Sequence, residues 1–305
     1  MRTLKYSLTA LLIVALVTVA LIVGRLSAPA PAGGASTPVR FTSYYLVVGA
    51  SESLGFQPTG IPGHNGERTN QGYANDLLFR ESLQGVTLTI EQVGCGADTV
   101  QSLLDTTTRA DVCNQPPTTQ LTRATAYLAA HKTDPVLVTV DLGFNDVRPC
   151  MQDDPVNDTC IDEGITAVQR DLPVIMKDLK AASGPQTRFV GLEYGDPFLG
   201  YYLDGASGPA RATATLQGMD ALDTVLGHIY ANAGVAVAKV PTLFEMNDNA
   251  LVTLDNVGTI PVNVQEACAL TWFCDAAPFG PDDHPNNAGY SLIAQAIEDV
   301  LPKSW

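Results

Sequence analysis

The apolar run PVLVTVDL at 135–142 constrains the fold of this chain more than any other stretch. It is continuous enough to be a β-strand that is buried on both faces, which is typical of parallel sheets covered by helices. Its one charged residue, Asp141, is then a buried carboxylate. A buried carboxylate needs hydrogen-bond partners, so Asp141 is expected to support a local polar network.

The apolar runs around this strand alternate between the periods of strands and helices. Further strands are predicted at 41–49, 86–93, 189–194 and 235–240, and helices at 73–83, 121–130, 165–179, 216–230 and 290–301. Strands separated by helices require crossover connections and a parallel sheet. We therefore predict a three-layer α/β/α sandwich with a parallel sheet of about five strands. Ligands of such sheets bind beyond the carboxyl ends of the strands.

The chain begins with a non-globular segment. Arg2 and Lys5 precede a nearly unbroken apolar run at 8–23, so residues 1–26 are predicted to be a signal peptide or a signal anchor. Residues 27–40 are rich in Ala, Pro and Gly and form a linker, and one domain spans 41–305. Both alternatives export the domain. We expect a secreted or extracytoplasmic protein that meets the membrane only through its N-terminal segment.

Six cysteines in an exported chain favour disulfides, and the absence of a C-x-x-C pair disfavours zinc. Six cysteines allow fifteen pairings, and we predict the pairing of sequence neighbours. The predicted pairs are Cys95–Cys113, Cys150–Cys160 and Cys268–Cys274. The last two pairs are expected to bracket loops with little core of their own.

The net charge of −15 disfavours nucleic acid as a partner, because an acidic surface repels a phosphate backbone. We expect a monomer that uses neither a cofactor nor a metal ion.

Small and polar residues follow three of the predicted strands, in Gly49-Ala50-Ser51, in GCGAD at 94–98 and in GFND at 143–146. Parallel strands place these endings on one rim of the sheet. Acyl transfer needs a nucleophile, a base, a group that orients the base, and donors for an oxyanion. The candidates are Ser51 as nucleophile, His284 as base, Asp282 or Asp283 as the orienting acid, and Asn145 with the N–H groups near Gly96 and Ala97 as donors. Each could be an ordinary turn or cap residue alone; their combination at strand ends indicates a site.

In this combination the chain resembles the SGNH, or GDSL-type, hydrolase family of esterases and lipases. The resemblance rests on Gly49-Ala50-Ser51, on Gly143-x-Asn145-Asp146, and on DDHP at 282–285 followed by Gly289-Tyr290. It implies that Ser51 rather than Ser53 is the nucleophile and that Asn145 is an oxyanion donor. It also implies that His284 is the catalytic histidine with Asp282 as its acid. Spacing agrees, because residues two apart in an extended segment share a side.

Three positions depart from the family pattern. Ala50 stands where an Asp is usual, Ala97 where a Gly is usual, and Pro281 at a place that often carries an acid. None of the three is the nucleophile. An N–H at 96 or 97 could still contribute to the oxyanion hole, provided that φ at Ala97 permits it.

The leading hypothesis is therefore an exported serine esterase or lipase that acts on a carboxylic ester. The alternatives on the same site are a carbohydrate O-deacetylase and an acyltransferase of the cell envelope. A third alternative is a catalytically inactive surface-binding module, which Ala50 and Ala97 would favour. In a fourth, Asp282, Asp283 and His284 are metal ligands. The acyl chain length and the alcohol half of the substrate do not follow from the sequence.

Overall fold

A computed structural model of the chain describes residues 41–62, 66–105 and 118–302. All of them lie in a single unit that begins at Arg40. The predicted N-terminal segment and linker lie outside the described residues, and so does Cys113, so the Cys95–Cys113 pair stays a prediction. Within the described ranges, no helix combines the length and the apolar character needed to cross a bilayer.

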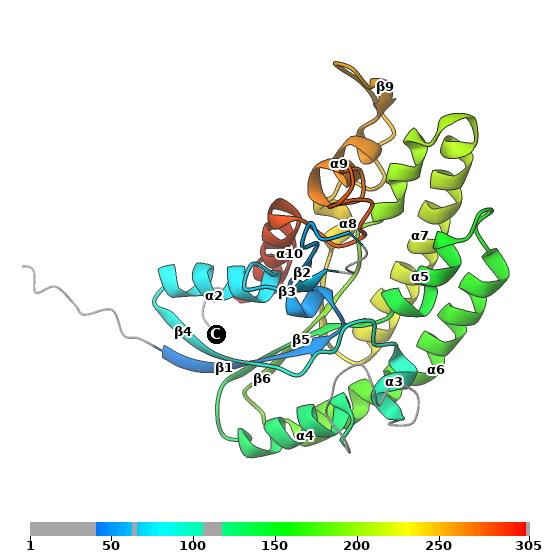
Figure 1. The fold of residues 1–305 in the computed structure, drawn as a ribbon. Helices are drawn as coiled ribbons and strands as arrows, with labels where there is room; N and C mark the ends of the chain where they lie inside the picture. Colours follow the sequence, from blue (N-terminus) through cyan, green and yellow to red (C-terminus); the bar gives the residue numbers. More distant parts are fainter. Residues whose placement is uncertain (1–40, 63–65, 106–117, 303–305) are drawn as a thin grey trace, which may run out of the picture. The chain divides into compact units, whose positions relative to one another are not determined.

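A parallel sheet of five strands forms the centre, which confirms the fold predicted from the sequence. Its order is β4 (Val86–Gln92), β1 (Phe41–Gly49), β5 (Val136–Asp141), β6 (Thr187–Leu192) and β7 (Ala236–Ala238). Figure 1 shows β1 and β5 in the middle of the sheet. All six residues of β5 are buried, as the apolar run predicted. Even Thr139 is paired there, because its hydroxyl lies 3.1 Å from that of Tyr45 on β1.

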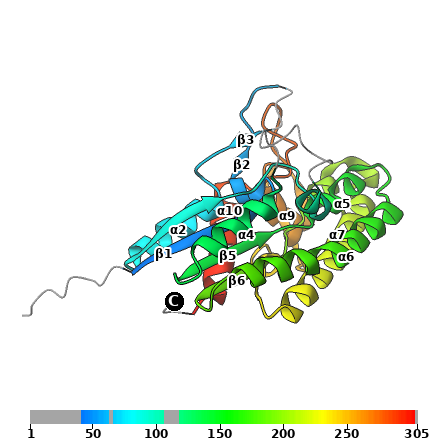
Figure 2. The same cartoon turned by 90° about the horizontal axis from the view of Figure 1, so that it is seen from below.

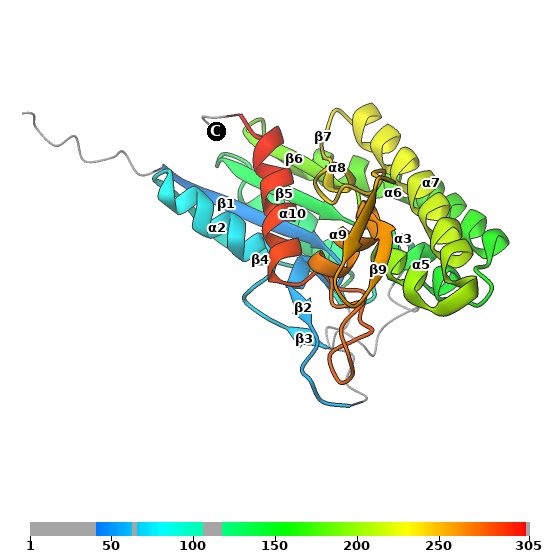
Figure 3. The same ribbon diagram turned by 90° about the horizontal axis from the view of Figure 1, so that it is seen from above.

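Helices cover both faces of the sheet. Figure 3 shows α2 (Tyr73–Leu83) and α10 (Asn287–Val300) over one face. Figure 2 shows α4 (Gln120–Ala130) and α6 (Asp158–Ala182) over the other, with α7 (Gly208–Asn232) beside α6. Each long helix buries one apolar stripe, such as Ile165, Val168, Leu172, Ile175 and Leu179 of α6.

Shorter elements fill the connections, and the sequence did not predict them. They are η1 (Glu52–Leu54), β2 (Phe56–Gln57), β3 (Glu67–Arg68), α3 (Val100–Leu104), α5 (Phe144–Gln152), η2 (Pro197–Leu203), η3 (Gly205–Ser207), α8 (Val240–Leu243), β8 (Leu251–Leu254), β9 (Gly258–Pro261) and α9 (Val262–Leu270). Most are too short to show a hydrophobic period. Pro149 also lies inside α5, where proline argues against a helix.

Two of the three predicted disulfides lie in the described part of the chain. Cys150 pairs with Cys160, and Cys268 pairs with Cys274. Cys150 lies in α5 and Cys160 in the first turn of α6, and the polar connection that they bracket is short, at 153–157. That bond therefore ties two helices together. The second bond ties α9 to the segment that leads to His284.

Candidate active site

The turn after β1 places its two serines, Ser51 and Ser53, in different environments. Ser53 is buried and its hydroxyl donates to the Ala50 carbonyl at 2.6 Å. Ser51 is the N-cap residue of η1 and is only partly buried. Its carbonyl accepts bonds from the N–H groups of Leu54 and Phe56, each at 3.1 Å. Ser53 therefore stabilises the turn, and Ser51 is the hydroxyl that a substrate could reach.

Two glycines, Gly49 at the end of β1 and Gly94 in the loop after β4, allow the neighbouring backbones to approach closely at this turn. A Cβ on Gly49 would lie 2.7 Å from the Asp141 carbonyl oxygen of β5. A Cβ on Gly94 would lie 2.3 Å from the Ser53 hydroxyl. The carboxyl ends of β1, β4 and β5 thus converge around Ser51, at the edge where an open α/β sheet binds its ligand.

A buried amide, Gln120, ties the β1 turn to the loop after β4, and the sequence gave no hint of this role. Its Oε1 accepts the Gly49 N–H at 2.8 Å, and its Nε2 donates to the Gly49 carbonyl at 3.0 Å. The same Nε2 donates to the Asp98 carboxylate at 2.7 Å. Only the packing of α4 against the sheet brings these groups together, so no local pattern could have shown it.

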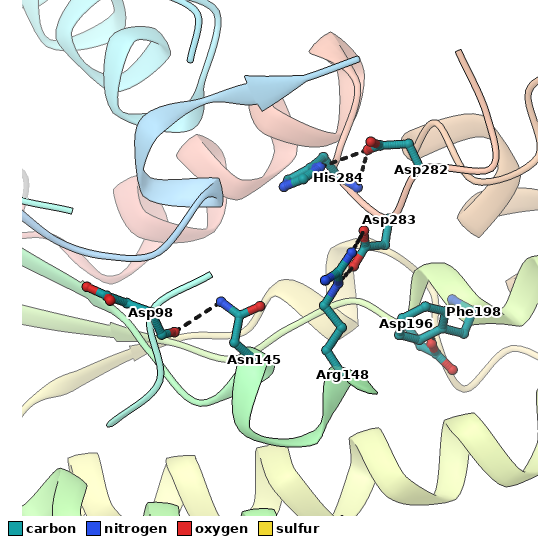
Figure 4. A network of polar contacts seen from close by, with 8 residues as sticks. All are labelled: Asp98, Asn145, Arg148, Asp196, Phe198, Asp282, Asp283 and His284. Atoms are coloured by element: carbon teal, nitrogen blue, oxygen red, sulfur yellow. Dashed lines mark hydrogen bonds and ion pairs between the residues drawn. The ribbon is translucent and has the colours of Figure 1, made fainter. Parts of the chain in front are cut away.

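Asn145 continues this network on the next strand end. Its Nδ2 donates to the Asp98 carbonyl at 3.0 Å, as Figure 4 shows. Asn145 lies in the first turn of α5, two residues after Gly143, whose φ of 121° few residues other than glycine adopt. The predicted residues Ser51 and Asn145 line one small pocket.

The loop between Cys95 and Asp98 carries the remaining predicted donors. Ala97 has a φ of 59°, the left-handed region that favours glycine. Ala97 therefore adopts a backbone conformation that favours glycine, at the position where the family usually has glycine. The role of this loop as an oxyanion donor stays a prediction.

His284 and Asp282 form the predicted pair. Asp282 Oδ1 lies 2.8 Å from His284 Nδ1 and also accepts the His284 backbone N–H at 2.9 Å. Burial works against a protonated ring, but the bond to Asp282 and the charges of Asp283 and Asp282 outweigh it and raise the pKa of His284. Because a carboxylate only accepts, Nδ1 carries the hydrogen and Nε2 is left as the basic nitrogen.

The neighbouring Asp283 has a different partner, which the sequence did not reveal. Its carboxylate accepts two bonds from Arg148 of α5, one of them from Nη2 at 2.9 Å. Burial works to raise the pKa of Asp283, but the Arg148 bond and the charge of His284 hold it below its usual value. In Figure 4 Arg148 and Asn145 rise from the same helix, three positions apart, toward the two halves of the site. Because residues three apart lie on the same face of a helix, this spacing could have indicated from the sequence that Arg148 lies near the site.

Phe56 connects the two halves. Its N–H bonds to the Ser51 carbonyl, and its ring centroid lies 5.8 Å from that of His284. Its own carbonyl accepts the Tyr290 hydroxyl of α10 at 2.8 Å. The residue after the Ser51 turn therefore packs directly on the histidine ring.

Two acids lie beside Ser51 in the small pocket. Asp141 is buried, and burial raises its pKa to about 6, although a 2.5 Å bond from the Tyr194 hydroxyl opposes the shift. Its second oxygen, Oδ2, has no hydrogen-bond partner among the described residues. Burial and the nearby charges of Asp141 and Asp283 raise the pKa of Glu52 well above its ordinary value.

Asp282, Asp283 and His284 are the one group of described residues whose ligand atoms lie close enough together to hold a metal ion, within 4.8 Å of one another. Their atoms are already engaged, since Asp282 bonds His284 and Asp283 bonds Arg148. The Arg148 cation also opposes a second cation at this place. The donor set therefore suits an acid–base pair better than a metal ion.

The fold is that of the SGNH, or GDSL-type, lipases and esterases. The extracellular lipase of Streptomyces rimosus is 18% identical with a TM-score of 0.51, and the match covers 85% of this chain and 100% of that one. Phospholipase A1 of Streptomyces albidoflavus is 17% identical with a TM-score of 0.52, over 85% and 99% of the two chains. No protein-family model matches the sequence, and no curated protein matches it as a relative.

Proposed function

We propose that the chain is an exported serine esterase or lipase that hydrolyses carboxylic esters. The observation that carries the proposal is the Asp282–His284 pair, bonded at 2.8 Å beside the strand-end turn that presents Ser51. Two disulfides and the likeness to an extracellular lipase support an extracytoplasmic location. The resemblance of the sequence blocks to the family supports the same roles.

In the proposed reaction, His284 Nε2 takes the proton of Ser51 as its Oγ attacks the ester carbonyl. The oxyanion accepts hydrogen bonds from the N–H of Ser51, an N–H of the Gly96–Ala97 loop, and Asn145. An amide nitrogen has two hydrogens, so Asn145 Nδ2 can bond the Asp98 carbonyl and still donate to the substrate. His284 then protonates the alcohol, and water releases the acid from the acyl-enzyme.

Asp282 keeps the Nδ1 hydrogen in place and stabilises the imidazolium that forms. Arg148 acts as a positioning residue, because it fixes Asp283 and with it the backbone next to His284. Acyl transfer to a second alcohol instead of water would use the same groups.

The test is a serine-directed phosphonate combined with an ester assay. The reagent should label Ser51, and Ser51→Ala should lower kcat by several orders of magnitude, on the order of 10⁴ or more. Ser82→Ala is the matched control, because Ser82 is an exposed serine on α2. Labelling at Ser53, or full activity in folded Ser51→Ala, would overturn the assignment. A folded chain that turns over no ester would instead favour an inactive binding module.

A further inference from the structure

Among the described residues, a hollow beside Ser51 and a hollow beside His284 differ greatly in size. The inner pocket, beside Ser51 and Asn145, holds about 10 Å³. The outer cleft, beside His284 and Asp282, holds about 300 Å³. In an acyl transfer the leaving oxygen must lie next to the histidine that protonates it. The outer cleft therefore suits the alcohol half of a substrate, and the inner pocket suits the acyl half.

The inner pocket is too small for a fatty acyl chain. Its volume is about the room that one water molecule needs, which also fits a methyl group. Its walls include Phe144, Tyr194, Glu52 and Asp141. Asp141 is 1% exposed, and its Oδ2 has no hydrogen-bond partner in the described part of the chain. A longer acyl chain would have to displace these side chains, because the pocket has no room for further methylene groups.

The outer cleft has room for a ring and groups that bind hydroxyls. Tyr201, Phe273 and Phe279 contribute aromatic faces, and the Phe279 side chain is 45% exposed. One face of Tyr201 is already covered by the Arg211 guanidinium at 3.4 Å, so the ring is held in place. Gln152, Arg148 and Asp282 add donors and acceptors along the same wall. Aromatic faces with a few polar groups are typical of sites for small polar molecules.

We propose that the substrate is an acetyl ester of a ring-sized alcohol that bears several hydroxyl groups, as in an O-acetylated carbohydrate. The proposal rests on the proposed serine esterase function and names its substrate class. Ser51 Oγ forms a bond to the acetyl carbonyl carbon, and the bond from that carbon to the alcohol oxygen breaks. The alcohol leaves with a proton from His284. Water then cleaves the acetyl-enzyme to acetate and free Ser51.

The acyl half is tested with 4-nitrophenyl acetate, butyrate and octanoate. We expect kcat/KM to fall at least tenfold from acetate to butyrate and again to octanoate. Glu52→Ala removes a wall of the inner pocket and should reduce the ratio of kcat/KM for acetate to kcat/KM for butyrate severalfold. Glu67 is an exposed residue of β3, so Glu67→Ala should leave this ratio of kcat/KM values unchanged. Equal or faster turnover of butyrate or octanoate by the unaltered protein would overturn the acetyl assignment while leaving the esterase function intact.

The alcohol half is tested by acetate release from glucose pentaacetate and from ethyl acetate. We expect the sugar ester to be the better substrate by at least tenfold in kcat/KM. Phe279→Ala should raise KM for the sugar ester about fivefold to tenfold and change ethyl acetate turnover little. Phe79→Ala is the matched control, because Phe79 is a phenylalanine on α2 that is 64% exposed. Equal turnover of the two esters, or equal effects of the two variants, would overturn the carbohydrate assignment. No turnover of any ester by the folded protein would overturn the esterase function as well.

Discussion

The two halves of the candidate site are held by different means. The Ser51 half lies at the end of β1, between β4 and β5, and buried bonds from Gln120 reach both the N–H and the carbonyl of Gly49. The His284 half lies in a connection between α9 and α10, which Cys268–Cys274 and the Arg148–Asp283 pair hold to the body. An isolated bridge between Thr271 and Pro285 adds backbone pairing.

The difference predicts how each half fails. Damage at the Ser51 half removes partners from groups inside the sheet, so it should lower the stability of the whole domain. Damage at the Asp282–His284 pair should move the histidine while the sheet stays folded, so it should lower kcat more than stability, whereas loss of the Arg148–Asp283 pair that holds this half should lower both. The four predictions that follow test this contrast, from the largest expected effect to the smallest.

The largest effect is expected from Asp282→Asn, at the His284 half. Loss of the carboxylate removes the group that fixes the ring, so kcat should fall about 100-fold or more, with little change in KM. The measurement is the pH dependence of kcat/KM. His284 acts as a base only when it is neutral, so activity is lost as the pH falls through its pKa. Asp282 helps to raise that pKa, so the acidic limb should move to lower pH in Asp282→Asn.

Asp283→Asn is the control for Asp282→Asn. It breaks the pair with Arg148, so the melting temperature should fall while the acidic limb moves less. If Asp283→Asn lost more activity than Asp282→Asn, with both variants folded, the roles of the two acids would be reversed.

The second prediction breaks the Ser51 half at Gln120. Gln120→Leu keeps a side chain of similar size but takes the acceptor from the buried Gly49 N–H. The Gly49 carbonyl keeps the bond from the Cys95 N–H, and the Asp98 carboxylate keeps the bond from the Ser102 hydroxyl, but each loses its bond from Gln120. An unpaired buried donor costs about 1–3 kcal/mol and the two lost bonds add to it, so we expect a loss of roughly 3 kcal/mol in the free energy of unfolding. Denaturant unfolding measures it. Gln101→Leu, an exposed residue of α3, should change stability by less than about 0.5 kcal/mol. Similar stability of the two variants would show that the network does not hold the turn.

Asp282 and Gln120 show which parts of the site could be predicted from the sequence and which could not. The strands and long helices were predictable, because the apolar period of β5 or α6 is a local property. Ser51, Asn145, Asp282 and His284 could be named because short blocks mark strand ends and a turn. Gln120 could not, since its partner Gly49 is 71 positions away and nothing near either residue indicates the contact. Arg148 could not be assigned to Asp283 either, because that pair spans 135 positions.

The third prediction concerns Arg148, which holds the His284 half. Arg148→Met leaves Asp283 buried with an unpaired charge. Because Arg148 is about one-third exposed, the cost should be moderate, about 2 kcal/mol, with kcat lowered about tenfold. The double variant Arg148→Met/Asp283→Asn removes the unpaired charge and should recover most of the stability. A double variant that is no more stable than Arg148→Met would show that the burial of an unpaired carboxylate is not the cause of the lost stability.

The smallest effect is expected at Ala97, on the loop that joins the Ser51 half. The residue holds a φ of 59°, which costs an L-residue with a Cβ roughly 1–2 kcal/mol. Ala97→Gly removes that cost but adds freedom to the unfolded chain, worth about 0.4–1 kcal/mol in the other direction. The net gain should be about 0.5–1 kcal/mol, which thermal unfolding would register as a rise of a few degrees. Ala129→Gly, at an exposed position in α4, should instead lower stability by about 1 kcal/mol. If both glycine variants were destabilised, the strain assigned to Ala97 would be wrong.

Ala97→Gly could also be more stable while kcat changed more than about threefold. The methyl group of Ala97 would then be setting the position of an oxyanion donor. In that case the alanine would be part of the site rather than a tolerated departure from glycine.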